Sequence, residues 1–394
     1  MLADEVVDTT SNVFIRKNLV IDLNGKTLTR RDNANGFIIS EANVDFVDNS
    51  EQQDGRVVNE TENGKCFHIQ IGSGVNIYAG TYESGYITVL SNNSDVNLLG
   101  GKIASTLYGV YNLGDSHFVV DGGKIETADY AVLQAAQNKF VLSDGEIKSE
   151  NNDAIYLYNQ CEFEINGGKI YGGRLGVCGS AKGSTVRMNG GEIESVSAGV
   201  ALFSGDKFYM VDGSIKSETS FGVSNNGTST NEPTIMQISG GRIESEKAAA
   251  LYHAGKGTLT ITGNPEFVGV TGIEIRAGQM TMTGGTVTGN GVPLDTKPNG
   301  NGSTTVGAGI AIVQHTTKLE LSVSISGGTI NGYTGLYESN VQNNADEDLQ
   351  KITINVTGGT FQAINGGENA ISIEDAGVVN VSISGETRRV VESE

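Results

Sequence analysis

The stretch from Gly122 to Ile147, GGKIETADYAVLQAAQNKFVLSDGEI, decides the fold because the motif that begins it returns near its end. A glycine doublet, or Asp-Gly, followed by a polar residue and then Ile, Val or Phe recurs along the chain. The second residues of six consecutive doublets lie 22, 22, 23, 23 and 22 residues apart. A fixed period of this size predicts a solenoid built from one repeated unit. These anchors are Gly101, Gly123, Gly145, Gly168, Gly191 and Gly213.

Three short strands fit into the unit that begins at Gly122. Ile125 and Thr127 alternate with polar neighbours, which is strand periodicity. A second apolar segment covers 131–134, and a third covers 140–142 and leads into the next doublet. Three strands and three bends in 22 residues describe one coil of a parallel β-helix. The doublets then mark bends that need positive φ or close approach of two backbones.

Aligning the units predicts columns of like residues that point into the core. One column is Ile103, Ile125, Ile147, Ile170, Ile193, Ile215 and Ile243. A second is small and polar, and we expect hydroxyl ladders to satisfy it between coils: Ser105, Thr127, Ser149, Gly172, Ser195, Ser217 and Ser245. The third, in the middle strands, is Val110, Val132, Ile155, Val177, Val200, Val223, Leu251 and Ile273.

These columns resemble the right-handed parallel β-helix of the pectin-lyase-like superfamily. The entry segment Leu19–Leu28, LVIDLNGKTL, is similar to the first coil of many bacterial and phage surface β-helices. The resemblance implies an all-β, single-stranded, right-handed helix of about fourteen coils. The expected organisation is an N-terminal leader or cap over 1–12, one β-helix domain over 13–385 and a C-terminal tail over 386–394.

Composition excludes several classes of partner. The net charge of −20 argues against binding nucleic acid through its phosphates and against docking on anionic lipid. No stretch is long and apolar enough to span a membrane, so we expect no membrane insertion. Cys66, Cys161 and Cys178 match no metal motif, and no disulfide is expected between the last two. The resemblance implies an extracellular, cell-surface or virion location.

Three insertions break the period, and function on rigid scaffolds concentrates in such loops. They cover 225–233, 289–307 and 339–350, each beside a middle strand in the C-terminal half. We expect them to wall a shallow groove on the middle-strand face, which the resembled superfamily also uses. The side chains expected to point outward there are Tyr111, Leu133, Tyr156, Cys178, Ala201, Ser224, Tyr252, Glu274, Ala311 and Tyr337.

The ligand-binding candidates are the outward residues nearest the insertions. Tyrosines can stack on sugar rings, while carboxylate and guanidinium groups bond hydroxyls. The alternative is that exposed tyrosine is ordinary strand filler. The candidates are Tyr252, Glu274, Arg276, Tyr337 and Glu338.

The same groove offers little for catalysis. Glu274, Arg276 and Glu338 are the only catalytic candidates, and the two carboxylates fall in different columns about 10 Å apart along the axis. The four histidines fall in four different coils, and His253 is expected to be a satisfied core histidine. No metal or other cofactor is expected, apart from possible Ca²⁺ binding by Asp346, Glu347 and Asp348, for which solvated loop charge is the alternative.

The sequence leaves three hypotheses for function. The first is a non-enzymatic, surface-displayed β-helix that binds cell-surface glycans, as an adhesin or a virion fibre or decoration protein would. The second is a polysaccharide lyase, hydrolase or phage depolymerase with its site between the insertions. The third is a purely structural spacer. The oligomeric state is open between a monomer and, for a virion protein, a trimer.

Overall fold

The computed structural model describes residues 12–32, 35–135, 137, 139–180, 183–225 and 232–392, together with the backbone of 5–7. Contacts divide the chain into two units, described separately below. The N-terminal unit is Met1–Gly179 with Ser184–Arg187 and Gly191–Glu194, and the C-terminal unit is Ser180–Gly183, Met188–Gly190 and Ser195–Glu394. Residues 226–231 of the first insertion and most of the expected leader lie outside the described residues.

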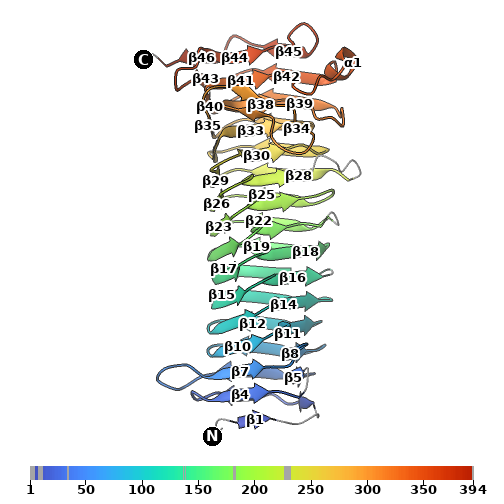
Figure 1. The fold of residues 1–394 in the computed structure, drawn as a ribbon, viewed down its shortest axis with the longest axis vertical. Coiled ribbons are helices and arrows are strands. Elements are labelled where there is room, and N and C mark those ends of the chain that lie inside the picture. The colour runs from blue at the N-terminus through green and yellow to red at the C-terminus, as the bar shows by residue number, and fades with distance from the viewer. Residues whose placement is uncertain are drawn as a thin grey trace. The chain divides into compact units, whose positions relative to one another are not determined.

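Each unit is a parallel β-helix, as the period predicts (Figure 1). A coil consists of a doublet strand after the glycines, a middle strand, and a closing strand that leads to the next doublet. The strands of these three kinds pair in parallel with their equivalents one coil away, so like residues face one another: Ile103 opposes Ile125, and Val110 opposes Val132.

The N-terminal unit has the following strands. Its middle strands are β2 (Val13–Ile15), β5 (Asn35–Ile39), β8 (Lys65–Ile69), β11 (Ile87–Asn92), β14 (Tyr108–Leu113), β16 (Val132–Ala135), β18 (Ile155–Asn159) and β21 (Val177–Cys178). Its closing strands are β3 (Leu19–Asp22), β6 (Asn43–Val47), β9 (Gly74–Ile77), β12 (Asp95–Leu98) and β19 (Glu162–Ile165). Its doublet strands are β1 (Glu5–Val7), β4 (Thr27–Arg30), β7 (Arg56–Asn59), β10 (Thr81–Ser84), β13 (Lys102–Ser105) and β20 (Lys169–Gly172).

Four further strands depart from this scheme. In β15 (His117–Thr127) and β17 (Lys139–Ser149) the closing and doublet strands run together through the glycines, where the sequence predicts a break. The register shifts around Asp121, which is how the continuous strands absorb the bend. β22 (Thr185–Met188) and β23 (Glu192–Ser195) contain residues of both units.

The C-terminal unit repeats the three ladders. Its middle strands are β24 (Val200–Leu202), β27 (Val223–Asn225), β30 (Ala249–His253), β33 (Thr271–Ile275), β38 (Ala308–Ile312), β41 (Thr334–Glu338) and β44 (Asn369–Ile373). Its closing strands are β25 (Lys207–Met210), β28 (Thr234–Ile238), β31 (Gly257–Ile261), β34 (Gly278–Met282), β39 (Leu321–Ile325), β42 (Ile352–Val356) and β45 (Asn380–Ile383). Its doublet strands are β26 (Ser214–Ser217), β29 (Arg242–Ser245), β32 (Glu266–Gly269), β35 (Thr286–Gly289), β40 (Thr329–Gly332), β43 (Thr360–Ala363) and β46 (Arg388–Val391).

The remaining elements belong to the insertions and the expected tail. β36 (Asp295–Thr296) and β37 (Thr305–Val306) pair as a small antiparallel ribbon inside insertion 289–307. Insertion 339–350 contains the short helix α1 (Asp346–Leu349). Residues 388–391, which the sequence analysis assigns to the tail, form β46 and pair with β43.

The predicted core columns are confirmed by burial. Every residue of the isoleucine column and of the middle-strand column is at most 1% exposed. The small polar column is also buried, and some of its hydroxyls do bond the neighbouring coil as expected, but to backbone carbonyls and not to one another. Ser105 Oγ donates to the backbone carbonyls of Ser84 and Tyr86, and Ser217 Oγ donates to Ser220 O. These hydroxyls satisfy carbonyls at the corner between two strands, where the backbone turns away from the ladder.

The doublet positions must be glycine because the backbones of neighbouring coils approach each other closely there. Gly145 has a φ of +102°, and a Cβ on it would lie 2.3 Å from the carbonyl oxygen of Gly123. Neither the conformation nor the space admits a side chain. This confirms the structural interpretation of the motif.

Candidate functional site

The middle-strand face of the C-terminal unit is where the sequence predicts an open groove. The predicted binding residues lie on its middle strands: Tyr252 on β30, Glu274 on β33, and Tyr337 and Glu338 on β41, with Arg276 directly after β33. All five are buried, at 0–5% exposure. The expectation that they project into an open groove is therefore wrong. Leu133, Cys178, Ala201 and Ala311, also expected outward, are buried as well.

Insertion 289–307 is what covers Glu274. The carboxylate accepts the Thr304 N–H at 2.9 Å from Oε1 and 3.1 Å from Oε2, and the Thr304 hydroxyl at 3.0 Å. Thr305 N–H adds a longer bond of 3.3 Å. Burial raises the pKa of Glu274, while Arg276 and the Thr304 donors oppose the rise. The loop thus caps a carboxylate that would otherwise lie bare on the strand.

Arg276 also holds insertion 289–307 in place, through hydrogen bonds to backbone carbonyls of the loop. Its Nη1 donates to the carbonyls of Gly302 at 2.6 Å and Asn299 at 2.9 Å, and to the Tyr252 hydroxyl at 3.2 Å. Its Nε lies 3.8 Å from Glu274 Oε1. Glu274 and Arg276 together hold the loop by charge-assisted hydrogen bonds. We call this arrangement the insertion lock.

The other described insertion joins the lock. Gln342, in 339–350, donates from Nε2 to Asn299 O at 2.7 Å, so one carbonyl receives both Gln342 and Arg276. The expectation that these two insertions flank the middle-strand face is confirmed. They cover Glu274 and Arg276 on that face, and a hollow of about 130 Å³ lies beside Tyr252, Phe221 and Asn301. That the five predicted residues bind a ligand stays a prediction, and Tyr252 is the one of the five that lines this hollow.

A second buried cluster holds the last coil against β41. Glu338 Oε2 accepts the Asp375 N–H at 3.1 Å, while the Tyr337 hydroxyl donates to Glu374 Oε1 at 2.7 Å. Glu338 Oε1 and Asp375 Oδ2 are both buried without a donor. Burial raises the pKa of Glu338 to about 7, and the neighbouring Asp375 and Glu374 carboxylates add to the shift. A protonated Glu338 can therefore donate to the Asp375 carboxylate.

One residue of the acidic run proposed for Ca²⁺, Asp348, is engaged in ion pairs. Asp348 lies at the end of α1, and both Lys318 Nζ and Lys351 Nζ contact its carboxylate at 2.7 Å. Hydrogen bonds from these lysines lower the pKa of Asp348. Within the described residues, no group of three or more His, Cys, Asp or Glu side chains could hold a metal ion. Ca²⁺ binding by Asp346, Glu347 and Asp348 stays a prediction.

The remaining predictions concern single residues. His253 is fully buried, as expected, and its Nδ1 lies 3.0 Å from Asn225 Nδ2. Burial lowers the pKa of His253 to about 4, so the ring is neutral at physiological pH. The three cysteines are buried, and no disulfide joins them to one another. In the described part of the chain, no helix has the length and apolar character needed to cross a membrane.

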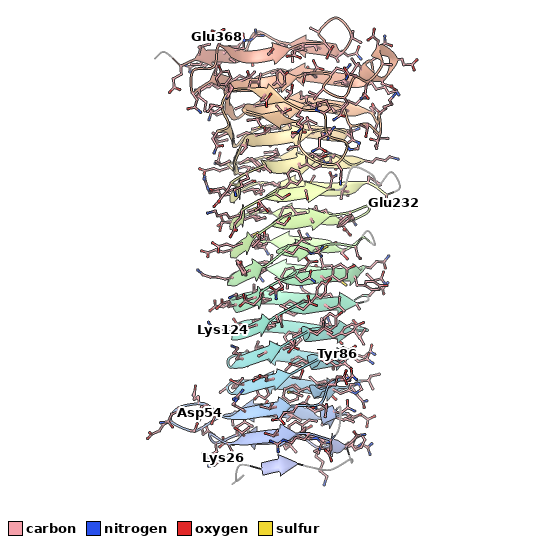
Figure 2. All side chains as sticks on the ribbon, in the orientation of Figure 1. Lys26, Asp54, Tyr86, Lys124, Glu232 and Glu368 are labelled. Carbon is pink, nitrogen blue, oxygen red and sulfur yellow. The ribbon has the colours of Figure 1, made fainter. Side chains whose placement is uncertain are left out.

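The N-terminal unit carries an aromatic surface that the sequence analysis did not single out as a site. Six tyrosines pack in a chain along its middle-strand face, with ring centroids 5.7–6.3 Å apart. Five are half-buried and Tyr158 is 55% exposed. Figure 2 shows Tyr86 near one edge of this unit and Lys124 at the opposite edge. We call this set the tyrosine row: Tyr86, Tyr108, Tyr111, Tyr130, Tyr156 and Tyr158.

The repeat itself could have revealed the row. Tyr86, Tyr108 and Tyr130 are spaced 22 residues apart, each at or just before the start of a middle strand. Tyr108 and Tyr130 stack with rings 22° from parallel. Only Tyr111 and Tyr156 entered the list of outward residues, because that list followed the middle strands and not the corners. Burial raises the pKa of Tyr108 and of Tyr156, so their hydroxyls keep their protons at neutral pH.

Comparison with protein families, with curated proteins and with solved structures finds no match to this chain. The parallel β-helix is therefore established by the strand pairing alone. The resemblance to the pectin-lyase-like superfamily and to phage proteins stays a prediction.

Proposed function

We propose that this protein is a non-enzymatic β-helix that binds glycans through the tyrosine row of its N-terminal unit, and that it is displayed outside the cell or on a virion. The observation that carries the proposal is the row itself. A parallel β-helix repeats about every 4.8 Å along its axis, so a regular polymer can place successive units over successive rings. Tyrosine suits such a surface because it joins an apolar ring to a hydroxyl.

The chemistry around the row supports a neutral, hydroxyl-rich ligand. The nearest carboxylates are already engaged: Asp129 accepts the Asn152 side-chain amide at 2.7 Å, and Asp153 accepts Arg174 Nε at 2.7 Å. The partly exposed tyrosine rings, with their hydroxyl groups, are the proposed recognition groups.

A polysaccharide-cleaving enzyme is the alternative, and burial argues against the residues predicted for it. The side chains of Glu274, Arg276 and Glu338 have no exposed surface. Glu274 and Arg276 also form hydrogen bonds to the insertion within the insertion lock. A glycosidase needs two carboxylates that flank the scissile bond. Carboxylates sealed inside the unit cannot do this.

The test is a panel of soluble polysaccharides assayed for both retention and product release. We expect retention without release, and a loss of retention in Tyr108→Ala/Tyr130→Ala and in the milder Tyr158→Ser. The matched control is Tyr78→Ala, a 47% exposed tyrosine in the same unit but outside the row. Thermal unfolding of each variant separates lost binding from lost folding.

Three outcomes would overturn the proposal. Failure of the wild-type protein to retain any polysaccharide would favour the structural spacer. Equal retention by the wild type and all row variants would remove the row as the binding surface. Release of oligosaccharides by the wild type would favour the enzyme.

A further inference from the structure

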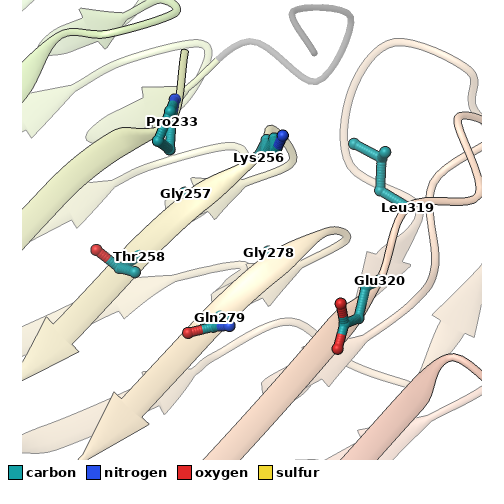
Figure 3. A pocket seen from close by; sticks show the side chains of 8 residues that line it. All are labelled: Pro233, Lys256, Gly257, Thr258, Gly278, Gln279, Leu319 and Glu320. Carbon is teal, nitrogen blue, oxygen red and sulfur yellow. The ribbon is translucent and has the colours of Figure 1, made fainter. Parts of the chain in front are cut away.

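A pocket of about 380 Å³ lies in the C-terminal unit where the closing strands β31, β34 and β39 begin (Figure 3). Its volume falls within the range of roughly 300–1,000 Å³ that is typical of small-molecule sites. It belongs neither to the insertion lock nor to the tyrosine row. The lining residues are Pro233, Lys256, Gly257, Thr258, Gly278, Gln279, Leu319 and Glu320.

Two glycines leave the floor of the pocket without side chains. Gly257 and Gly278 occupy paired positions at the start of β31 and β34. A Cβ on Gly257 would lie 2.2 Å from Thr234 O, and one on Gly278 would lie 2.6 Å from Gly257 O. These positions therefore stay bare, and the backbone of two coils forms the base of the hollow.

The walls carry opposite charges and apolar groups. Figure 3 shows Lys256 and Pro233 on one side and Leu319 and Glu320 on the other, with Gly278 between them. Lys256 and Glu320 are exposed. The ion pairs found among the described residues of this unit involve other side chains. The pocket thus presents one ammonium and one carboxylate that are available to a ligand.

These groups select a net-neutral ligand with two separated charges. A simple anion would suit Lys256 but would meet Glu320 and a protein of net charge −20. A simple cation would suit Glu320 but would be repelled by Lys256. A zwitterion satisfies both walls, and an apolar side chain on it can pack against Pro233 and Leu319.

We propose that this pocket binds a free amino acid with an apolar side chain. Its carboxylate contacts the Lys256 ammonium, its ammonium contacts the Glu320 carboxylate, and Gln279 and Thr258 supply further hydrogen bonds. The site lies in a different unit from the tyrosine row and takes a different class of ligand. Amino-acid binding at this pocket and glycan binding at the tyrosine row can therefore be tested independently.

The experiment is a titration of the full chain with L-leucine, followed by calorimetry or by NMR. Three probes dissect the ligand: isocaproate lacks the ammonium, isoamylamine lacks the carboxylate, and glycine lacks the side chain. We expect saturable binding of leucine and at least tenfold weaker binding of each of the others.

Substitutions of Lys256 and Glu320 then test which side chain binds each charged group of the ligand. Lys256→Met and Glu320→Gln should each weaken leucine binding at least tenfold, while Lys247→Met, an exposed lysine elsewhere in the unit, should leave it unchanged. The tyrosine-row variants should bind leucine normally, and the pocket variants should retain polysaccharide. The inference is overturned if leucine does not bind, if isocaproate or isoamylamine binds equally well, or if the variants bind like the wild type.

Discussion

The middle-strand faces of the two units differ although both are built on the same coil. In the N-terminal unit the face is open and lined by half-buried tyrosines. In the C-terminal unit it is covered by an insertion that a buried Glu274 and Arg276 hold down. The core beneath is the same column of Val, Ile and Leu in both. A solenoid can therefore change the character of one face from coil to coil, because each coil contacts only its neighbours.

The closing strands of the two units also differ, although less than their middle-strand faces do. In the N-terminal unit the residues just before two buried phenylalanines have ionisable side chains that are paired: His117 with Asp95, and Lys139 with Glu164. On β31 and β34 of the C-terminal unit the equivalent residues are the neutral Thr258 and Gln279. Short neutral side chains beside bare glycines leave a hollow where the other unit has a charged surface. The pocket proposed above is the consequence.

The largest expected effect comes from breaking the insertion lock. Glu274→Ala leaves Arg276 buried without its carboxylate, and removing one partner of a buried pair costs about 3–5 kcal/mol. We expect the free energy of unfolding to fall by that amount and the 289–307 segment to become sensitive to proteases. Lys124→Ala, which breaks an exposed pair with Glu146, is the control and should change stability little. Equal effects of the two substitutions would contradict the lock.

Substituting doublet glycines tests whether the two units share one scaffold. Gly145→Ala and Gly241→Ala place a Cβ 2.3 Å from Gly123 O and 2.6 Å from Gly213 O, in residues with φ of +102° and +80°. Each should lower stability by about 1–3 kcal/mol, measured by denaturant unfolding. Gly377→Ala, whose Cβ meets nothing within 4 Å, should be nearly neutral. A loss confined to one unit would show that the doublets have different roles.

The Glu338 cluster gives the C-terminal unit a pH dependence. Because burial raises the pKa of Glu338 to about 7 in the folded state, against 4.5 ordinarily, the group favours folding fully below pH 4.5. Its contribution is lost as pH rises from 4.5 through 7. Glu338→Gln mimics the protonated acid, so it should be more stable than the wild type at pH 8 by on the order of 2–3 kcal/mol and equal to it at pH 4.

Unfolding curves at several pH values measure this difference. Glu368→Gln, which changes an exposed carboxylate in the next coil, is the matched control and should follow the wild type at every pH. If the gain of Glu338→Gln were the same at pH 4 and pH 8, the carboxyl group would not be the titrating element.

A smaller effect than that of the insertion lock is expected from the tyrosine row. Tyr130→Ala removes ring contacts with Tyr108 and Tyr156, and such aromatic pairs contribute about 0.5–1.5 kcal/mol each beyond their buried area. Tyr130→Phe keeps the rings and should keep the stability while losing one hydroxyl. Thermal unfolding compares the two. A loss as large in Tyr130→Phe as in Tyr130→Ala would mean that the hydroxyl, and not the stacking, holds the row together.

Much of the candidate site could have been found from the period, and part could not. Tyr86, Tyr108 and Tyr130 follow the 22-residue spacing, so alignment of the corners predicts that they lie side by side. Glu274 alternates with inward Ile273 and Ile275, so alternation places it outward. Alternation does not say what will lie on top of it. The hydrogen bonds from Thr304 come from 30 residues away, through a loop that has no period.

The sequence by itself determined the parallel β-helix, the identity of the core columns and the position of the insertions. It could do so because equivalent residues stack directly on one another in neighbouring coils, so that a linear period becomes a spatial ladder. Only the tertiary structure decided which faces are open, since insertion 289–307 buries Glu274 and Arg276 by contacts that no repeat encodes. The pocket of Lys256 and Glu320 likewise depends on the segment Leu319–Glu320, which is held beside the start of β34 by a hydrogen bond from Gly278 N–H to Glu320 O. Local periodicity fixes a scaffold, whereas the course of irregular segments over it depends on the full balance of long-range contacts.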